Sequence, residues 1–337
     1  MNRRNFLGAA GATVTASLAG CGRPSESLPM PAAVPISSFT AEATAEIVTA
    51  GLDLTGKTAL VTGANSGLGY ETMRVLALRG AHVIGAARTL EKARAACASV
   101  DGEATPVAIE LSDFASVRAC VGAVRALDLP LDILVCNAGI MELPDRELVE
   151  GLERHFVVNH LGHFILVNGL RQQLTAAPQG RVVMLASGSA TRSAPEAGIL
   201  FDNLSLDGVY EPGLAYGHSK LANVLFSLEL ARRFRETPGN RCTSNAISPG
   251  VIMTNLGRHM PWWKITAARL FGWAFMRSVP QGAATTCYVA TNPALAQVSG
   301  YFFKNCNPHR PGGHTENAAM ARRLWDVSRE LTADYLI

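Results

Sequence analysis

Short apolar runs alternate with amphipathic stretches along most of the chain after residue 55. The runs are rich in residues that favour strands, and the stretches between them place apolar residues at helical spacing. This alternation predicts strands at residues 57–62, 82–87, 106–110, 131–136, 181–186, 243–247 and 301–304. Strands spaced by helices form parallel sheets covered on both faces, so we expect a doubly wound α/β fold with a mainly parallel, seven-stranded sheet.

Helices are expected between these strands, at residues 70–78, 90–98, 112–127, 148–174 and 214–234. Ser112 and Asp113 supply the capping side chains that a helix start favours. Nothing marks a boundary within residues 56–337, so this range is predicted to be a single domain.

The first residues lack the alternation. Arg3 and Arg4 precede an apolar stretch, residues 8–20, that is shorter than the roughly 20 residues of a transmembrane helix. Paired arginines before such a stretch are typical of a twin-arginine export signal, and residues 18–21 (LAGC) resemble a bacterial lipobox. The alternatives are an ordinary hydrophobic N-terminus and a start codon placed too early.

We therefore expect residues 1–21 to be a signal peptide, with a lipid attached to Cys21 after cleavage. Residues 22–55, rich in Ser, Pro, Ala and Thr, are expected to be a flexible tether. The protein would then be exported, and either periplasmic or attached to the membrane through that lipid alone. Without a working signal it would stay in the cytoplasm.

Composition and cysteine spacing bear on the binding partners and on disulfide formation. Of 337 residues 17% are charged, the net charge is +3, and no dense Lys/Arg run occurs, which disfavours nucleic-acid binding. The cysteines are scattered without a Cys-x-x-Cys pair. A twin-arginine substrate folds in the reducing cytoplasm, so the six cysteines beyond Cys21 are expected to be buried free thiols: Cys97, Cys120, Cys136, Cys242, Cys287 and Cys306.

A glycine-rich turn lies between the first predicted strand and the first helix. Glycines let the backbone approach a pyrophosphate, and the following helix offers unpaired N–H groups to it. This position predicts a Rossmann-type dinucleotide site, with a plain tight turn as the alternative. The expected binding residues in the turn are Gly63, Asn65, Ser66, Gly67, Leu68 and Gly69.

The end of the second strand bears on the choice of cofactor. NAD sites of this type place a carboxylate there, but this strand ends at Ala87 and Arg88 follows. A guanidinium can pair with a 2′-phosphate, so NADP (NADPH) is favoured and NAD is less expected. The alternative is that Arg88 is a solvated residue of the next helix. Asn65 could assist, and so could Lys92, although Lys92 is more simply an exposed side chain.

Tyr216 and Lys220 have a Tyr-x-x-x-Lys spacing within a predicted helix. The two side chains then lie one turn apart on the same face. An ammonium there should lower the pKa of the phenol from about 10 toward working pH. Because this spacing is common by chance, its meaning depends on the neighbouring motifs.

Those motifs occur in order. Asn137-Ala138-Gly139 follows the fourth strand, Asn159 lies in VVNHLGHF (157–164), Ser187 closes the fifth strand, and Ser248-Pro249-Gly250 ends the sixth with Thr254 beyond it. In these motifs the chain resembles the short-chain dehydrogenase/reductase family from about residue 56 to its end. The segments AYGHSKLAN (215–223), NHLGHF (159–164) and SGYFFKNCNP (299–308) are most similar to the retinol dehydrogenase and protochlorophyllide reductase branches.

The resemblance implies four catalytic roles. Tyr216 would exchange a proton with the substrate oxygen while a hydride moves to or from nicotinamide. Lys220 would hold the ribose hydroxyls and depress the tyrosine pKa, and Ser187 would hydrogen-bond the substrate oxygen. Asn159 would position a water that links Lys220 to solvent.

The resemblance also implies further cofactor contacts. Two departures accompany them: Ala186 replaces the first of the family's paired serines, and Glu110 replaces an adenine-side Asp, a change expected to be tolerated. Besides Tyr216 and Lys220, the implied contacts are Glu110, Leu111, Asn137, Ala138, Gly139, Pro249, Gly250, Val251 and Thr254.

Two other patterns invite interpretation. His155, His160 and His163 share one predicted helix, but no carboxylate or cysteine completes a metal site, so we expect no metal and a structural role. Residues 259–276 contain an aromatic cluster that would cover the substrate as an apolar lid in this family. Core packing and a surface that leans on the membrane are the alternatives.

Together these features predict an NADP-dependent oxidoreductase that interconverts a carbonyl and an alcohol on a hydrophobic small molecule. The alternative is a non-catalytic NADP-binding protein that senses redox state or acts as a scaffold. The resemblance leaves open a homo-oligomer built through the long helices.

Overall fold

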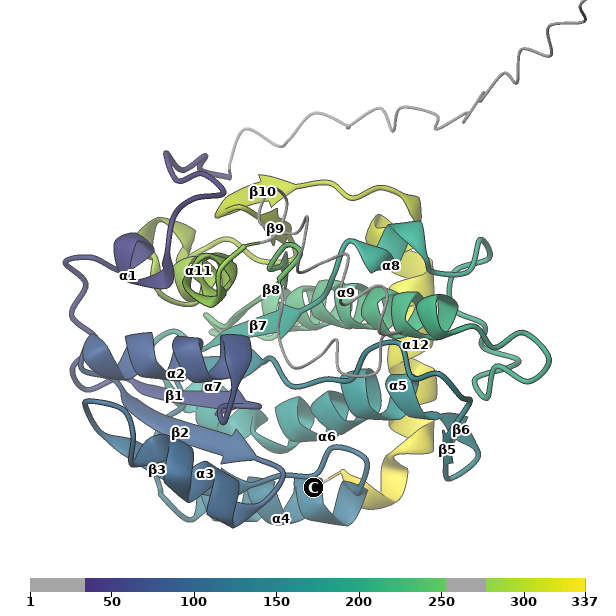
Figure 1. The fold of residues 1–337 in the computed structure, drawn as a ribbon, viewed down its shortest axis with the longest axis horizontal. Coiled ribbons are helices and arrows are strands. Elements are labelled where there is room, and N and C mark those ends of the chain that lie inside the picture. Colours follow the sequence, from purple (N-terminus) through teal and green to yellow (C-terminus); the bar gives the residue numbers. More distant parts are fainter. Residues whose placement is uncertain (1–33, 253–276, 337) are drawn as a thin grey trace, which may run out of the picture.

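The computed structural model describes residues 34–252 and 277–336. Eight strands form one sheet in the order β10-β9-β8-β7-β4-β1-β2-β3 (Figure 1). Every neighbouring pair is parallel except β9 and β10. The strands are β1 (Thr58–Thr62), β2 (His82–Ala87), β3 (Ala104–Ala108), β4 (Ile133–Cys136), β7 (Arg181–Leu185), β8 (Thr243–Ser248), β9 (Phe302–Lys304) and β10 (Asn307–His309).

Helices cover both faces of the sheet, as the alternation predicts. Their bounds are α1 (Ala45–Val48), α2 (Gly67–Leu78), α3 (Leu90–Cys97), α4 (Phe114–Arg125), α5 (Arg154–Phe156), α6 (Gly162–Gly169), α7 (Arg171–Ala176), α8 (Ser189–Arg192), α9 (Pro212–Glu236), α11 (Val279–Thr291) and α12 (Ala318–Leu331). A π-helical turn, Val157–Leu161, joins α5 to α6. The expected doubly wound α/β domain is therefore confirmed.

The strands are buried on both sides because their alternate residues enter two separate cores. In β1, Leu60 packs into the core formed with α4, α6, α9 and α12, whereas Ala59 and Val61 pack into the core formed with α1, α2 and α11. Such strands carry apolar residues continuously, because neither face meets solvent. The six described cysteines, from Cys97 to Cys306, are buried free thiols within these layers.

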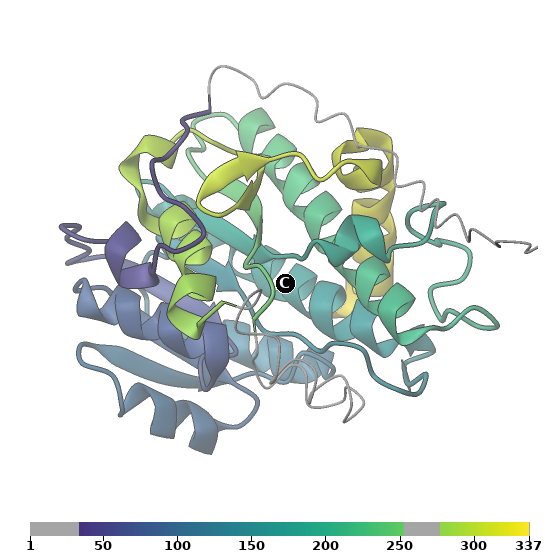
Figure 2. The same ribbon diagram turned by 45° about the horizontal axis from the view of Figure 1, so that its top comes forward.

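Helix α12 lies across α9 on the first of these layers (Figures 1 and 2). Its Trp325 stacks on Phe226 of α9 with ring centroids 5.6 Å apart, and it meets Phe164 of α6 edge-on at 5.0 Å. His160 bonds Ser328 of the same helix at 2.7 Å. The outer surface of α9 is thus covered by the chain's own C-terminal helix.

The sheet has eight strands rather than the expected seven, because the chain turns back after β9. Asn305 and Cys306 both have positive φ, 56° and 58°, which is the geometry of a two-residue type I′ hairpin turn. A second turn at Glu150 and Gly151 pairs β5 (Leu148–Val149) with β6 (Leu152–Glu153). The helix expected at residues 148–174 therefore begins only at Arg154.

The expected tether needs a correction for residues 34–55, which pack against the domain. Ser37 N donates to Asn307 Oδ1 at 2.8 Å, and Asn307 Nδ2 donates to the carbonyl oxygen of Phe39 at 3.0 Å. The Phe39 ring meets Tyr288 of α11 edge-on at 5.8 Å. This segment runs beside β10, the edge strand of the sheet (Figure 2); residues 22–33 lie outside the described range.

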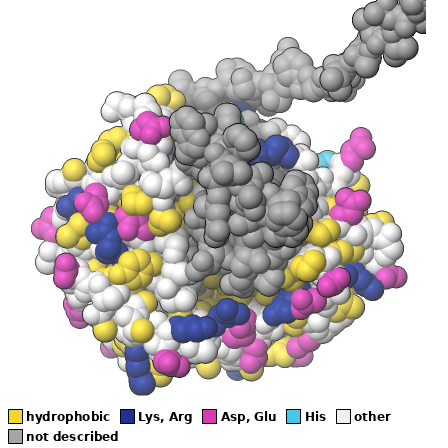
Figure 3. All heavy atoms as spheres, in the orientation of Figure 1, with side chains coloured by type: hydrophobic (Ala, Val, Ile, Leu, Met, Phe, Trp, Pro, Cys, Tyr) yellow, Lys and Arg dark blue, Asp and Glu magenta, His cyan; other side chains and the backbone are white. Residues whose placement is uncertain are grey.

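Charged side chains are interspersed over the face drawn in Figure 3, where Lys and Arg lie among Asp and Glu. That distribution agrees with the near balance of charge in the sequence. Within residues 34–252 and 277–336, no helix is both long and apolar enough to cross a bilayer.

Candidate active site

A cavity of about 450 Å³ opens at the carboxyl ends of β1, β4 and β7. The strand order reverses at β1, and ligands of open α/β sheets bind at such a switch point. The cavity joins the glycine-rich turn to the Tyr-x-x-x-Lys helix. Its lining consists of Gly63, Asn65, Ser66, Gly67, Leu68, Ala87, Arg88, Lys92, Ile109, Glu110, Leu111, Asn137, Ala138, Gly139, Ile140, Arg154, Val158, Leu185, Ala186, Tyr216, Lys220 and Pro249.

The glycine-rich turn is packed too closely to accept side chains. A Cβ atom on Gly69 would lie 2.3 Å from the carbonyl oxygen of Gly63, and Gly63 and Gly67 have φ of 70° and 55°. Ser66 precedes α2 with extended backbone and makes no side-chain cap to that helix. The first N–H groups of α2 therefore face the cavity, an arrangement that fits the pyrophosphate of a dinucleotide.

Arg88 and Lys92 line the cavity beyond the end of β2, and Arg88 is exposed. Thr89 caps α3 through Lys92 N, so Arg88 precedes that helix rather than belonging to its first turn. Glu110 lies after β3, where its Oε1 accepts from Ser112 N at 3.1 Å and from Ser112 Oγ at 2.8 Å. Both bonds to Ser112 hold the Glu110 carboxylate within the turn that follows β3.

Tyr216 and Lys220 lie one turn apart on α9, with Lys220 Nζ 5.7 Å from the centre of the phenol ring. Lys220 Nζ donates to the carbonyl oxygen of Leu185 at 3.0 Å, and Asn223 Nδ2 donates to the same oxygen at 3.0 Å. Burial lowers the pKa of Lys220 to about 8. The ammonium is therefore held at the end of β7 and remains largely charged at neutral pH.

The expected depression of the tyrosine pKa is wrong for this arrangement. Burial raises the pKa of Tyr216 to about 12, a hydrogen bond from Ser187 opposes that rise, and the nearby carboxylate of Glu142 adds to it. The Lys220 ammonium, which donates to the Leu185 carbonyl oxygen, does not reverse this rise. Tyr216 is accordingly a protonated hydroxyl, and a potential proton donor, at neutral pH.

Ser187 and Asn159 flank the tyrosine. Ser187 Oγ accepts from Ser189 N at 3.1 Å, which fixes the hydroxyl in the turn after β7. Asn159 lies in the π-helical turn, a local distortion that is frequent at functional sites. Its side-chain Nδ2 donates to Ser219 Oγ at 2.9 Å, so the amide contacts α9 directly beside the Tyr216–Lys220 turn.

His163 connects the end of β1 to the π-helical turn that contains Asn159, and no sequence motif predicts this connection. Its Nδ1 donates to the backbone oxygen of Asn159 at 3.0 Å, and its Nε2 lies 3.0 Å from Thr62 Oγ1. Thr62 Oγ1 in turn accepts from Asn137 N at 2.9 Å and from Ala138 N at 3.0 Å. Burial lowers the pKa of His163 to about 4, so its structural role is that of a neutral linker.

The predicted site residues divide into four groups. Most line the cavity, including Tyr216, Lys220 and the Asn137–Gly139 motif, whereas Gly69, Asn159 and Ser187 support it from outside. Gly250 and Val251 do not line it, and Val251 is 61% exposed. Thr254 and the aromatic cluster at residues 259–276 lie outside the described residues.

Seven lining residues were not predicted as site residues: Ala87, Ile109, Ile140, Arg154, Val158, Leu185 and Ala186. Arg154 brings a further cation to the wall, and its buried Nε has no hydrogen-bond partner among the described residues. Arg154 lies three residues before the VVNHLGHF motif and Val158 is its second residue, so the two are four residues apart and share one helical face. The four-residue spacing of this pair was the signal available in the sequence.

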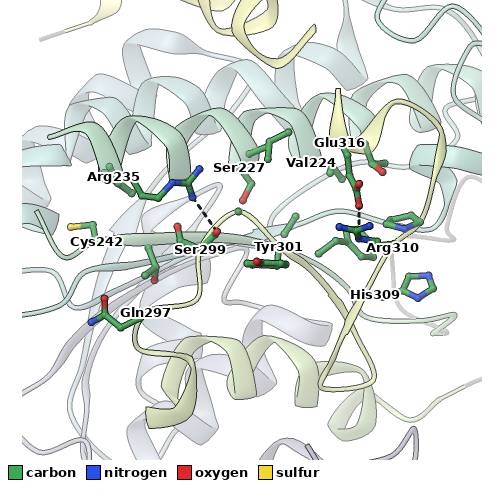
Figure 4. A pocket seen from close by; sticks show the side chains of 18 of the residues that line it. Val224, Ser227, Arg235, Cys242, Gln297, Ser299, Tyr301, His309, Arg310 and Glu316 are labelled. Atoms are coloured by element: carbon green, nitrogen blue, oxygen red, sulfur yellow. Dashed lines mark hydrogen bonds and ion pairs between the residues drawn. The ribbon is translucent and has the colours of Figure 1, made fainter. Parts of the chain in front are cut away.

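No group of three or more His, Cys, Asp or Glu side chains that could hold a metal occurs in the described parts of the chain. A second cavity, of about 600 Å³, lies between α9 and the β9–β10 edge (Figure 4). There Arg235 Nη1 donates to the carbonyl oxygen of Ser299 at 3.2 Å, and Arg310 pairs with Glu316 at 3.3 Å. This larger cavity contains none of the four predicted catalytic residues.

Comparison with known proteins agrees with this geometry. Residues 57–199 match the family model described as short chain dehydrogenase. The chain is 39% identical over 307 residues to short-chain dehydrogenase TIC 32 B, chloroplastic, of Brassica napus, covering 88% of this chain and 94% of the relative. It is 37% identical over 296 residues to human retinol dehydrogenase 11, covering 85% of this chain and 88% of the relative.

A solved structure described as the Pseudomonas aeruginosa RhlG/NADP active-site complex superposes with a TM-score of 0.59. The two chains are 25% identical, and the match covers 75% of this chain and 95% of that one. With the sheet order, the glycine-rich turn and the Tyr216–Lys220 helix in place, these matches show that the chain belongs to the short-chain dehydrogenase/reductase family of oxidoreductases.

Proposed function

We propose that this protein reduces the carbonyl group of a hydrophobic small molecule with NADPH, using Tyr216 as the proton donor. The observation that carries the proposal is that Tyr216 and Lys220 line one end of a cavity, with Ser187 and Asn159 supporting them from behind its wall, while the glycine-rich turn lines the other end. The nicotinamide ring, when bound, supplies the hydride.

The protonation state of Tyr216 favours reduction over oxidation. A phenol with a pKa of about 12 keeps its proton at neutral pH and can donate it to a substrate oxygen that gains negative charge. The Ser187 hydroxyl would donate a second hydrogen bond to that oxygen. The Lys220 ammonium lies close enough to stabilise the tyrosinate that remains after transfer.

The preference for NADP is supported by charge. Arg88 and Lys92 line the cavity beyond the end of β2, and no carboxylate stands at the end of that strand. A guanidinium there suits a 2′-phosphate, which a carboxylate would repel. A relative described as a retinol dehydrogenase supports a hydrophobic substrate.

The deciding experiment follows NADPH absorbance with a panel of hydrophobic aldehydes and ketones. Tyr216→Phe should lower kcat by at least about 10²-fold, because removal of a general acid typically costs 10²–10⁴. NADPH affinity should remain within about twofold of the parent. Unchanged turnover in the variant, or binding of NADPH without turnover of any compound, would favour the non-catalytic alternative.

We further propose that the protein is exported by the twin-arginine route and lipidated on Cys21. Support comes from Arg3 and Arg4 before the apolar stretch and from the lipobox-like residues 18–21. Labelled palmitate should be incorporated by the parent and not by Cys21→Ala. Replacing Arg3 and Arg4 by lysine should retain the protein in the cytoplasm; export of that variant would contradict the route.

A further inference from the structure

The segment after β4, residues 140–143, is fixed at its beginning by Asn159. Asn159 Oδ1 accepts from Ile140 N at 2.8 Å, and Asn159 Nδ2 donates to the carbonyl oxygen of Ile140 at 3.0 Å. One carboxamide thus satisfies both peptide groups of Ile140. Because the same amide also donates to Ser219 Oγ, the segment is tied to the catalytic helix α9.

The end of the segment is fixed in the same manner by two other side chains. Leu143 N donates to His155 Nε2 at 3.3 Å, and Tyr210 Oη donates to the carbonyl oxygen of Leu143 at 2.6 Å. Burial raises the pKa of Tyr210 to about 12, so this hydroxyl keeps its proton at neutral pH. Leu143 is buried, and both of its peptide groups depend on side-chain partners.

Glu153 determines whether His155 can accept that bond. His155 Nδ1 lies 2.6 Å from Glu153 Oε1, Glu153 Oε2 accepts from Phe156 N at 3.1 Å, and both side chains are fully buried. The ring must offer a lone pair at Nε2 to the Leu143 N–H, so its proton resides on Nδ1, where the carboxylate accepts it. The carboxylate therefore selects the tautomer that holds the segment.

His155, which holds the end of the segment, also contacts the proposed catalytic tyrosine. The His155 ring meets the Tyr216 ring edge-on, with centroids 6.4 Å apart and an interplanar angle of 67°. Between the two anchored residues, Glu142 has φ of 45°, a left-handed conformation uncommon outside glycine. Such backbone persists only where its surroundings determine it, which the anchors at Ile140 and Leu143 do.

We propose that Glu153 and His155 are positioning residues for the reaction at Tyr216. The pair fixes residues 140–143 as a rigid wall beside the phenol and supports one edge of its ring, so that the substrate oxygen meets the hydroxyl in reactive geometry. A displacement of about 1 Å at a reacting group can cost on the order of 10²-fold in rate. The kinetic part of this inference rests on the proposed function.

The test compares His155→Leu with His155→Gln as a matched control. A glutamine amide can donate to Glu153 and accept from Leu143 N, whereas leucine can do neither. We expect His155→Leu to lower kcat by about 10- to 100-fold with the Kd for NADPH within about twofold. His155→Gln should retain kcat within about threefold of the parent. A twofold or smaller loss in His155→Leu, or equal losses in both variants, would overturn the proposal.

Amide hydrogen exchange tests the same role without catalysis. Exchange in a peptide covering residues 140–147 should accelerate in His155→Leu and not in His155→Gln, because the Leu143 amide loses its acceptor only in the former. Unchanged exchange would overturn the holding role even if no substrate were ever turned over. A failed Tyr216→Phe test with altered exchange would instead locate the error in the proposed function.

Two milder variants serve if His155→Leu does not fold. Tyr210→Phe removes only the hydroxyl on the Leu143 carbonyl, and Glu153→Gln presents an N–H₂ group either to Phe156 N–H or to His155. Both should lower kcat and accelerate exchange in residues 140–147 while NADPH affinity is kept. Full kcat with parental exchange in both would refute the proposal.

Discussion

The two ends of the cavity are built in different ways. The proposed phosphate-binding end, called the phosphate end below, consists of backbone N–H groups of α2, closely packed glycines and exposed cations such as Arg88. At the proposed catalytic end, called the catalytic end below, Lys220 and Asn159 are held by hydrogen bonds between segments distant in the chain. The phosphate end therefore depends on local backbone shape, whereas the catalytic end depends on buried polar side chains that must all be satisfied.

Lowering the pH should destabilise the catalytic end more than the phosphate end, and we expect this to be the largest effect of the series. Burial lowers the pKa of His160 to about 3 and those of His163 and His218 to about 4. As the pH falls below about 6.5, these histidines become protonated in the unfolded chain but stay neutral in the folded one. The free energy of unfolding therefore decreases until the pH reaches their pKa values in the folded state. Each group contributes up to about 1.4 kcal/mol per pH unit, which sums to several kcal/mol by about pH 4.5.

Denaturant unfolding at a series of pH values measures this loss. His218→Gln, which can still accept from Leu200 N, is the control and should flatten the dependence by one group's share. Hydrogen exchange at about pH 5 should increase first around residues 155–165 rather than around β1. Equal acceleration at both ends would contradict the difference between them.

Replacing Lys220 by methionine should have the next largest effect. We expect kcat/KM to fall by about 10³-fold, because the charge that stabilises the tyrosinate is removed. The melting temperature should stay the same or rise, because burial already disfavours this ammonium and Asn223 still satisfies the Leu185 carbonyl. A large drop in melting temperature would mean that Lys220 is mainly structural.

Arg88→Asp should alter the phosphate end without affecting folding. The kcat/KM for NADPH is expected to fall by about 10²-fold while that for NADH stays level or rises, because the carboxylate repels a 2′-phosphate and accepts ribose hydroxyls. Lys92→Ala provides a milder loss of charge at the same rim. Equal losses of kcat/KM with NADPH and NADH would mean that Arg88 does not discriminate between the two cofactors.

Gly69→Ala should give the smallest effect of the series. The added Cβ would lie 2.3 Å from the Gly63 carbonyl oxygen, so α2 must shift, and we expect about tenfold weaker NADPH binding with about 1–2 kcal/mol lost stability. Gly122→Ala in α4 has open space around its Cβ and should be neutral or slightly stabilising. Titration of NADPH fluorescence and thermal unfolding measure both variants.

The phosphate end was largely predictable from the sequence because its determinants are local. A glycine-rich turn between an apolar run and a helix can be recognised from the sequence, and Arg88 directly follows the second strand. The strand and helix order followed from periodicity alone. The hairpin at β9–β10 was missed because its turn uses Asn305 and Cys306 rather than the Asn-Gly pair that signals such turns.

The catalytic end was predictable in its residues but not in its connections. The motifs located Tyr216, Lys220, Ser187 and Asn159, whereas the bond from His163 to Thr62 spans 101 positions and leaves no local pattern. Burial, which sets the Tyr216 pKa, is likewise a property of packing rather than of spacing. The expected fall of that pKa toward neutral pH failed because burial is the largest influence on it.

The packing of residues 34–55 has a practical consequence for protein production. Periodicity places the start of the domain near residue 56, and a truncation there would remove Ser37 and Phe39 from β10 and α11. The polar side chain of Asn307 and the ring of Tyr288 would then lose their cover at this edge of the sheet, and the newly exposed apolar surface would favour aggregation. A recombinant form that starts at or before residue 34 keeps these contacts.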